Sequence, residues 1–194
     1  MNKYGIQFSI LDLGKMRSDI NLMVPGTVIA TRSEPEAKNR MVDVPIDSIL
    51  IHVPDYGYIL CDLGCDPKGM SQNWPESIKE MTPYYQDETQ TLEYQLGLVG
   101  LTPKDIRTVI LSHMHVDHAG YLYLFPHAQV IVQKDEFAQA FAYVFEQLDQ
   151  NGRTLYMRRD ITVSVDKYTL IQGDYQVCPG VTCISLPGHS AGLM

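Results

Sequence analysis

Residues 112–120 read Ser-His-Met-His-Val-Asp-His-Ala-Gly (SHMHVDHAG), and this stretch decides how the rest of the chain is interpreted. Its ligand-type side chains, all within six residues, are His113, His115, Asp117 and His118. Imidazole and carboxylate are the groups that Zn²⁺ and similar divalent ions bind in proteins. Buried without partners, they would be strongly destabilising. The stretch therefore predicts a metal-binding loop rather than a polar loop with coincidental histidines.

The spacing within this loop predicts two neighbouring metal positions. In an extended segment, residues two apart point to the same side, so His113 and His115 can hold one ion. Asp117 and His118 follow where the chain turns, and we expect them to face a second ion. Gly120 allows the backbone to turn tightly beside them.

Both candidate loops of the chain follow predicted strands. The first comes after Thr108–Leu111, a short β-branched run. The second, LPGHSAG at 186–192, follows the run Val181–Leu186. Ends of strands are where folds commonly place functional groups. A lone histidine in such a turn indicates little by itself, but together with the first loop His189 becomes the natural third imidazole for the first metal.

The remaining pattern predicts a mixed α/β layered fold, because helices and strands alternate without a strict repeat. Ser48–Val53 and Tyr58–Asp62 flank a turn with Pro, Asp and Gly and predict a hairpin. Residues 67–83 are rich in Pro, Gly and Ser and predict a surface segment. The other predicted elements are helices over Thr91–Val99 and Asp135–Gln150 and strands over Gln129–Gln133, Thr162–Val165, Tyr168–Ile171 and Tyr175–Val177.

Length, composition and charge exclude several classes of protein. With 194 residues, one domain over 1–194 is expected. The formal net charge of −8 argues against nucleic-acid or anionic-membrane partners, because phosphate binding needs a basic face. No apolar run is long enough to span a membrane, and no signal peptide is recognisable. Four cysteines are too few for a disulfide scaffold, so a cytoplasmic location is expected.

The HxHxDH pattern at 113–118, the later Gly188-His189 and the preceding ILCDLG at 59–64 resemble the metallo-β-lactamase superfamily of metal-dependent hydrolases. The resemblance runs from about Ile49 to the end of the chain. Within the superfamily, three stretches are similar to the N-acyl homoserine lactone hydrolases, the quorum-quenching lactonases. These stretches are SHMHVDHAG, VIVQKDEFAQA and LIQGDYQVCPGVTCISLPGHSAG.

This resemblance implies a fold and a ligand set. The fold would be an α/β, metallo-β-lactamase-like αββα sandwich of two similar halves. His113, His115 and His189 would bind the first metal, and Asp117 and His118 the second. The cofactor would be zinc, with two ions in the complete protein, although other divalent metals suit the same ligands.

The implied reaction is the opening of a lactone ring. Two close ions would lower the pKa of a bridging water, and the hydroxide would attack the lactone carbonyl. Asp117 would be the catalytic residue that passes a proton to the departing alkoxide. The expected partner is a small-molecule lactone or ester, and a homodimer stays open.

The family completes its site with a bridging aspartate and a final histidine, both C-terminal to the Gly-His motif. No Asp or His follows His189 in these 194 residues. We therefore expect a domain that is C-terminally incomplete, with its second half largely missing. The second metal and the activity of this chain alone would then require residues from elsewhere, and exposed apolar sheet surface would favour association.

Other interpretations stay open at this point. The chain could belong to another hydrolase of the superfamily: a thioesterase of the glyoxalase II kind, a β-lactamase or a phosphodiesterase. It could also be a truncated, non-catalytic metal-binding module. The aromatic stripe of the helix predicted over Asp135–Gln150 is interpreted as core packing, with a wall for an acyl chain as the alternative.

Overall fold

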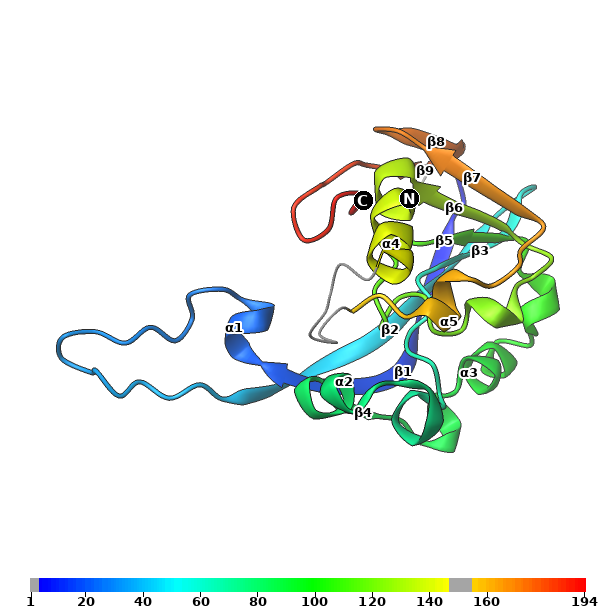
Figure 1. Ribbon diagram of the computed structural model, residues 1–194. Helices are drawn as coiled ribbons and strands as arrows, with labels where there is room; N and C mark the ends of the chain where they lie inside the picture. The colour runs from blue at the N-terminus through cyan, green and yellow to red at the C-terminus, as the bar shows by residue number, and fades with distance from the viewer. Residues whose placement is uncertain (1–3, 147–154) are drawn as a thin grey trace.

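A computed structural model describes residues 4–146 and 155–194, and its centre is a seven-stranded mixed sheet (Figure 1). The strand order is β4-β1-β2-β3-β5-β6-β7. The strands are β1 Gln7–Asp19, β2 Met41–Val53, β3 Gly57–Cys61, β4 Tyr84–Tyr85, β5 Thr108–Ile110, β6 Gln129–Gln133 and β7 Lys167–Ile171; β8 Tyr175–Cys178 and β9 Val181–Cys183 form a separate two-stranded sheet. The α-helices are α1 Ile20–Met23, α2 Glu76–Met81, α3 Leu92–Leu98, α4 Lys134–Phe145 and α5 Arg158–Ile161. The mixed α/β architecture predicted from the sequence is confirmed.

The sheet changes from antiparallel to parallel at β3. Strands β1, β2 and β3 pair antiparallel, whereas β3, β5, β6 and β7 run parallel. Every residue of β5 is buried, as expected for a parallel strand covered on both faces. Cys61 of β3 pairs with Ile110 of β5, so the residues that follow these two strands meet at one edge of the sheet.

The two faces of the sheet are covered differently. Helices α2 to α5 contribute to the larger core, which also takes Leu50, Leu60 and Val130 from the sheet. The other face packs in part against the β8–β9 hairpin through a smaller apolar cluster around Ile59 and Ile131.

An arm formed by residues 20–40, between β1 and β2, projects away from the rest of the molecule (Figure 1). The arm begins with α1, whose N-terminus is capped by Asp19: its carboxylate accepts a hydrogen bond from the Asn21 N–H at 2.8 Å. The Asn21 amide in turn donates to Asn39 at 2.9 Å and to the Val28 carbonyl at 3.1 Å, which ties the two sides of the arm together.

Several predicted elements are confirmed by the structure. The hairpin forms with His52 opposite Tyr58, although β2 begins earlier, at Met41. Helix α3 has Thr91 as its N-cap, and β6 has the predicted bounds. Helix α4 confirms the helix predicted over Asp135–Gln150 as far as Phe145, and residues 147–150 of that prediction lie outside the described residues.

Other expectations were wrong. The run Thr162–Val165 is not a strand, because α5 precedes it and Thr162 caps that helix, its hydroxyl donating to the Arg158 carbonyl at 2.8 Å. The strand predicted over Val181–Leu186 ends at Cys183. Residues 67–83 are not merely a surface segment: they form a π-helical turn and α2, and they bury Trp74 and Ile78. No helix in the described part of the chain is both long and apolar enough to cross a membrane.

Candidate metal centre

The histidines of the two predicted loops meet at the edge of the sheet. One ring nitrogen from each of His113, His115 and His189 lies within 4.8 Å of the other two. The closest approach is 3.1 Å, between Nδ1 of His115 and Nε2 of His189, residues that are 74 positions apart. His113 and His115 are buried, and His189 is exposed. The structure therefore brings together the three residues predicted for the first metal.

The residues predicted for the second metal lie beside the first group. Ligand atoms of His113, Asp117 and His118 also fall within 4.8 Å of one another. Nε2 of His118 lies 3.3 Å from Oδ2 of Asp117, and the His113 and His118 rings are 3.9 Å apart between centroids. His113 is thus shared between the two groups, an arrangement that the sequence analysis did not anticipate.

Asp62 holds the metal loop against the end of β3. Its backbone takes a φ of 58°, which turns the chain sharply after the strand. The carboxylate accepts hydrogen bonds from both the backbone N–H and the hydroxyl of Ser112, each at 2.7 Å, and lies 2.9 Å from Nδ1 of His118. A carboxylate bonded to the second nitrogen of a ligand histidine fixes the ring and its tautomer. Through these contacts Asp62 supports both the start of the ligand loop and the His118 ring.

The donor set fits a divalent metal ion. Nε2 of His113 is buried and has no hydrogen-bond partner among the described residues. An imidazole nitrogen buried without a partner is costly, and a metal ion would satisfy it. Three imidazoles with a neighbouring carboxylate match the ligand preferences of Zn²⁺ and similar ions. The cluster can therefore hold a cation at the point where its nitrogens converge.

Burial and charge set the protonation of these groups. Burial, with His118 and His115 nearby, lowers the pKa of His113 to about 2, and burial lowers the pKa of His115 to about 4. Both rings are neutral at physiological pH, the form that binds a metal. Burial opposes a charge on His118, but the Asp117 and Asp62 carboxylates raise its pKa to about 10. Burial would also raise the pKa of Asp117, yet His118 outweighs it and holds that pKa below its usual range.

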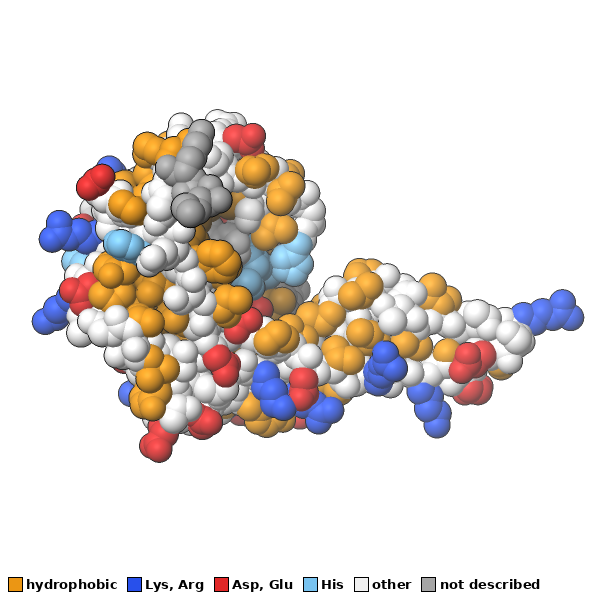
Figure 2. All heavy atoms as spheres, turned by 180° about the vertical axis from the view of Figure 1, so that it is seen from behind, with side chains coloured by type: hydrophobic (Ala, Val, Ile, Leu, Met, Phe, Trp, Pro, Cys, Tyr) orange, Lys and Arg blue, Asp and Glu red, His pale blue; other side chains and the backbone are white. Residues whose placement is uncertain are grey.

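A mainly apolar pocket opens onto this cluster. The arm and the strands that carry it provide half of the lining residues. Figure 2 shows histidine side chains gathered where the arm joins the body, with hydrophobic side chains beside them. No residue of α4 lines this pocket, and Phe137 and Phe141 pack against the larger core instead. The pocket residues are Met16, Ser18, Leu22, Met23, Val44, Thr82, His115, Asp117, Leu155 and His189.

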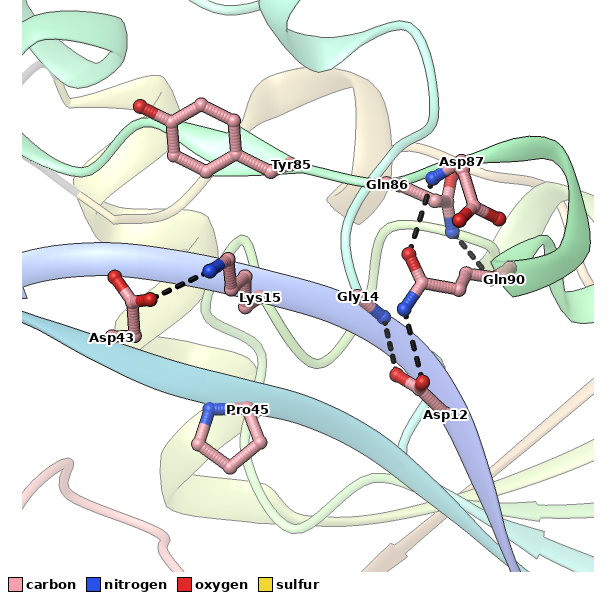
Figure 3. Close-up of a pocket in the computed structure, with 9 residues that line it drawn as sticks. All are labelled: Asp12, Gly14, Lys15, Asp43, Pro45, Tyr85, Gln86, Asp87 and Gln90. Carbon is pink, nitrogen blue, oxygen red and sulfur yellow. Dashed lines mark hydrogen bonds and ion pairs between the residues drawn. The ribbon is translucent and has the colours of Figure 1, made fainter.

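A second, polar pocket lies between β1, β2 and the segment after β4, away from the histidines (Figure 3). Its acidic groups have partners within the chain. The Asp12 carboxylate accepts hydrogen bonds from the Gly14 N–H and the Gln90 amide, both at 2.9 Å, and Asp43 pairs with Lys15 at 2.6 Å. These contacts stabilise the bend of β1 and leave the histidine cluster as the better candidate for a functional site.

Two parts of the site are not predicted by the sequence pattern. The apolar residues of the arm are one, because nothing in the local pattern of residues 1–46 connects them with residues 112–118. Glu136, a buried carboxylate that contacts both loops, is the other, because a glutamate in the first turn of a helix is ordinary. The spacing of residues in the sequence identifies neither the arm residues nor Glu136 as parts of the site.

Comparisons with known proteins are consistent with this geometry. Residues 42–134 match the family model described as the metallo-beta-lactamase superfamily. N-acyl homoserine lactonase AiiB from Agrobacterium fabrum is 33% identical over 199 aligned positions, which cover 98% of this chain and 71% of that protein.

Two solved structures extend the similarity to the fold. One is B. thuringiensis AiiA, a mutant with N-decanoyl-L-homoserine bound at its active site; it has a TM-score of 0.74 and 26% identity, over 96% of this chain and 67% of that one. The other is an N-acyl homoserine lactone hydrolase with the product N-hexanoyl-L-homoserine bound at its catalytic metal centre. Its TM-score is 0.73 and its identity 25%, with the same coverage of 96% and 67%.

Proposed function

The chain belongs to the metallo-β-lactamase superfamily, and from this premise we propose that it hydrolyses the lactone ring of N-acyl homoserine lactones at a divalent metal centre. Its fold is the metallo-β-lactamase fold expected from the sequence. The single observation that carries the proposal is the convergence of His113, His115 and His189, with Nε2 of His113 buried and unpartnered among the described residues.

The pocket beside the histidines is small, with a volume of about 40 Å³, but its lining is mainly apolar, as contact with an acyl chain requires. Leu22 and Met23 of the arm, together with Leu155, place apolar side chains next to His115, Asp117 and His189. A substrate with a polar ring and an apolar chain could place the ring at the histidines and the chain against the arm. This arrangement replaces the alternative in which the aromatic residues of α4 form the wall.

The residues of the site divide the chemistry among them. His113, His115 and His189 would hold one ion, and Asp117 and His118 would hold a second; zinc is the metal that we propose. A bound divalent ion supplies a Lewis acid for the carbonyl and lowers the pKa of a coordinated water. Asp117 is ionised in this environment and can take the proton released by the attacking water. It then returns that proton to the ring oxygen as the ester bond breaks, which gives the ring-opened N-acyl homoserine.

Hydrolysis of N-hexanoyl homoserine lactone, followed by chromatography of the ring-opened product, tests the proposal. We expect activity that a chelator abolishes and added Zn²⁺ restores. His113→Ala should reduce kcat/KM by at least about 100-fold, because removal of a metal ligand disables the centre. His127→Ala is the matched control, since His127 is exposed and lies outside both ligand groups.

Two results would contradict the proposal. One is hydrolysis that survives chelation or is equal in His113→Ala and the unmodified protein. The other is a higher kcat/KM for a thioester, a β-lactam or a phosphodiester than for the lactone, which would point to another reaction of the superfamily. Measured metal content per chain, from elemental mass spectrometry, would show how many ions the site holds.

A further inference from the structure

Glu136 is a fully buried carboxylate that the proposed reaction does not use. It lies in the first turn of α4 with an exposed fraction of 0%. Among the described residues, no lysine or arginine forms an ion pair with it. A buried carboxyl group without a cationic partner must be satisfied by hydrogen bonds, so the donors that Glu136 binds are expected to matter.

Two of its three donors come from the metal-ligand loops, one from each loop. Oε1 accepts hydrogen bonds from the Met114 N–H at 2.9 Å and from the Tyr156 hydroxyl at 3.0 Å. Oε2 accepts one from the Gly192 N–H at 3.2 Å. Met114 lies between His113 and His115, and Gly192 lies three residues after His189.

Two further contacts hold the two ligand loops close to Glu136 and α4. The Tyr156 ring, held by its hydroxyl on Glu136, packs against the His115 ring with 4.6 Å between centroids. Gly192 lies so close to α4 that a Cβ atom there would overlap the backbone nitrogen of Glu136. Glu136 is thus bonded to each loop, through Oε1 to the loop of His113 and His115 and through Oε2 to the loop of His189.

We propose that Glu136 is a positioning residue that joins the loop of His113 and His115 to the loop of His189, and so holds the three imidazoles at metal-binding separation. The part of this proposal that concerns metal affinity rests on the proposed function. The part that concerns the joining of the loops does not.

Glu136→Gln tests the proposal with a minimal change of shape. Because two of the three donors share Oε1, the amide oxygen is expected to stay with Met114 and Tyr156. The amide NH₂ group would then face the Gly192 N–H, which it cannot bond. The variant should therefore release the His189 loop and leave the other loop in place. Glu146→Gln, the same substitution at the exposed C-cap of the same helix, is the matched control.

The first measurement is amide hydrogen exchange followed by NMR, without added metal. We expect faster exchange at Gly192 in Glu136→Gln and no change in Glu146→Gln. Unchanged exchange at Gly192 would overturn the joining role, whether or not the protein binds a metal. Because no metal is present, this measurement tests the joining of the loops separately from the proposed function. If the unmodified protein failed to bind Co²⁺, that failure would contradict the proposed function and the predicted effect on metal affinity, but not the joining of the loops.

The second measurement is a Co²⁺ titration followed by visible absorption. The dissociation constant should rise about 10–100-fold in Glu136→Gln, the usual loss when a group that orients metal ligands is removed. It should stay within about twofold in Glu146→Gln. In a His189→Ala background, Glu136→Gln should have little further effect, because the two changes act through the same ligand. An equal effect in both backgrounds would overturn the proposal.

A second variant covers the case in which Glu136→Gln does not fold. Gly192→Ala pushes the His189 loop away from α4 and keeps the carboxylate, so it should weaken Co²⁺ binding by a similar factor. Gly97→Ala is its control, because a Cβ at Gly97 meets nothing within 4 Å. Co²⁺ affinity in Gly192→Ala equal to that of the control would contradict the proposal.

Discussion

At the scale of single residues, carboxylates that are buried or half-buried differ in how they are stabilised. Half-buried Asp62 and fully buried Glu136 each have three polar partners within hydrogen-bond distance. Asp160 is different: it is buried, and its Oδ2 has no hydrogen-bond partner among the described residues. Burial raises the pKa of Asp160 to about 8, against the smaller opposing effect of Arg159. Folding is therefore coupled to the binding of a proton by the Asp160 carboxyl group.

Asp160 should make the protein less stable as the pH rises. The unfolded carboxyl loses its proton near a pKa of about 3.9, whereas the folded one keeps it until about 8. The free energy of unfolding should fall across this range, by up to about 1.4 kcal/mol per pH unit. Asp160→Asn should remove the dependence and stabilise the protein by about 1–3 kcal/mol near neutral pH.

Urea unfolding at about pH 5 and about pH 8 measures this effect. Asp166→Asn, at an exposed position close by in the sequence, should behave like the unmodified protein. A gain in stability from Asp160→Asn that is the same at both pH values would show that the Asp160 proton is not the cause.

At the scale of elements, close approach between segments distinguishes glycines that look alike in the sequence. Gly120 ends the metal loop, and a Cβ there would overlap the backbone of Cys65 and Asp66. The Gly120 N–H also donates to the Gly64 carbonyl at 2.8 Å, so the metal loop lies directly on the segment after β3. Gly97, near the end of α3, has open space around it.

We expect opposite effects from alanine at these two positions. Gly97→Ala should stabilise the protein by about 0.5–1 kcal/mol, because alanine loses less backbone entropy in a helix. Gly120→Ala should destabilise it by about 2–3 kcal/mol, because neither backbone can move away without disturbing the sheet edge. Thermal unfolding of both variants shows whether each substitution raises or lowers stability. A loss of stability in Gly97→Ala, or no loss in Gly120→Ala, would contradict the packing around these two glycines.

The arm between β1 and β2 should influence which acyl chains are accepted. Leu22→Ser removes an apolar surface from the pocket wall, and each buried methylene contributes about 0.8 kcal/mol. We expect kcat/KM to fall about 3–10-fold for an N-decanoyl lactone and to change little for an N-butanoyl lactone.

Leu98→Ser is the matched control for this prediction, because Leu98 is an exposed leucine that does not line the pocket. An unchanged ratio of the two kcat/KM values in Leu22→Ser would contradict the role of the arm.

At the scale of the whole molecule, the second face of the sheet is only partly covered. The β8–β9 hairpin packs on part of it. Phe8 and Ile10 of β1 and Ile49 of β2 lie on the same face and keep exposed fractions of 71%, 64% and 42%. Contiguous apolar surface of this kind favours association in water.

We therefore predict that the 194-residue chain self-associates through this face. Light scattering after gel filtration should give a mass above that of one chain. The double substitution Phe8→Ser with Ile10→Thr should shift it toward the monomer, because it removes the two more exposed of the three apolar side chains named on this face. Ile29→Thr, at an exposed isoleucine of the arm, is the control. A monomer for the unmodified chain at high concentration would contradict the prediction.

The local sequence pattern was sufficient to predict secondary structure wherever the deciding residues lie within a few positions of one another. The β-branched runs around 48–62 and 129–133 predict strands because neighbouring side chains and turn residues decide them. Local pattern was insufficient for Thr162–Val165, because a β-branched run becomes a strand only where a neighbouring strand accepts its hydrogen bonds. Residues 67–83 were also misjudged, because burial of Trp74 depends on a core that the local composition does not describe.

The sequence by itself determined the ligand types, the loop at 112–120 and the family, because a metal loop is a short motif whose chemistry is carried by its own residues. The tertiary structure decided what that loop meets. It brings His189 to within 3.1 Å of His115 across 74 positions, closes the pocket with the arm and sets Glu136 between the two loops. These contacts depend on how strands and helices pack, and packing between distant segments leaves no periodic trace in the sequence.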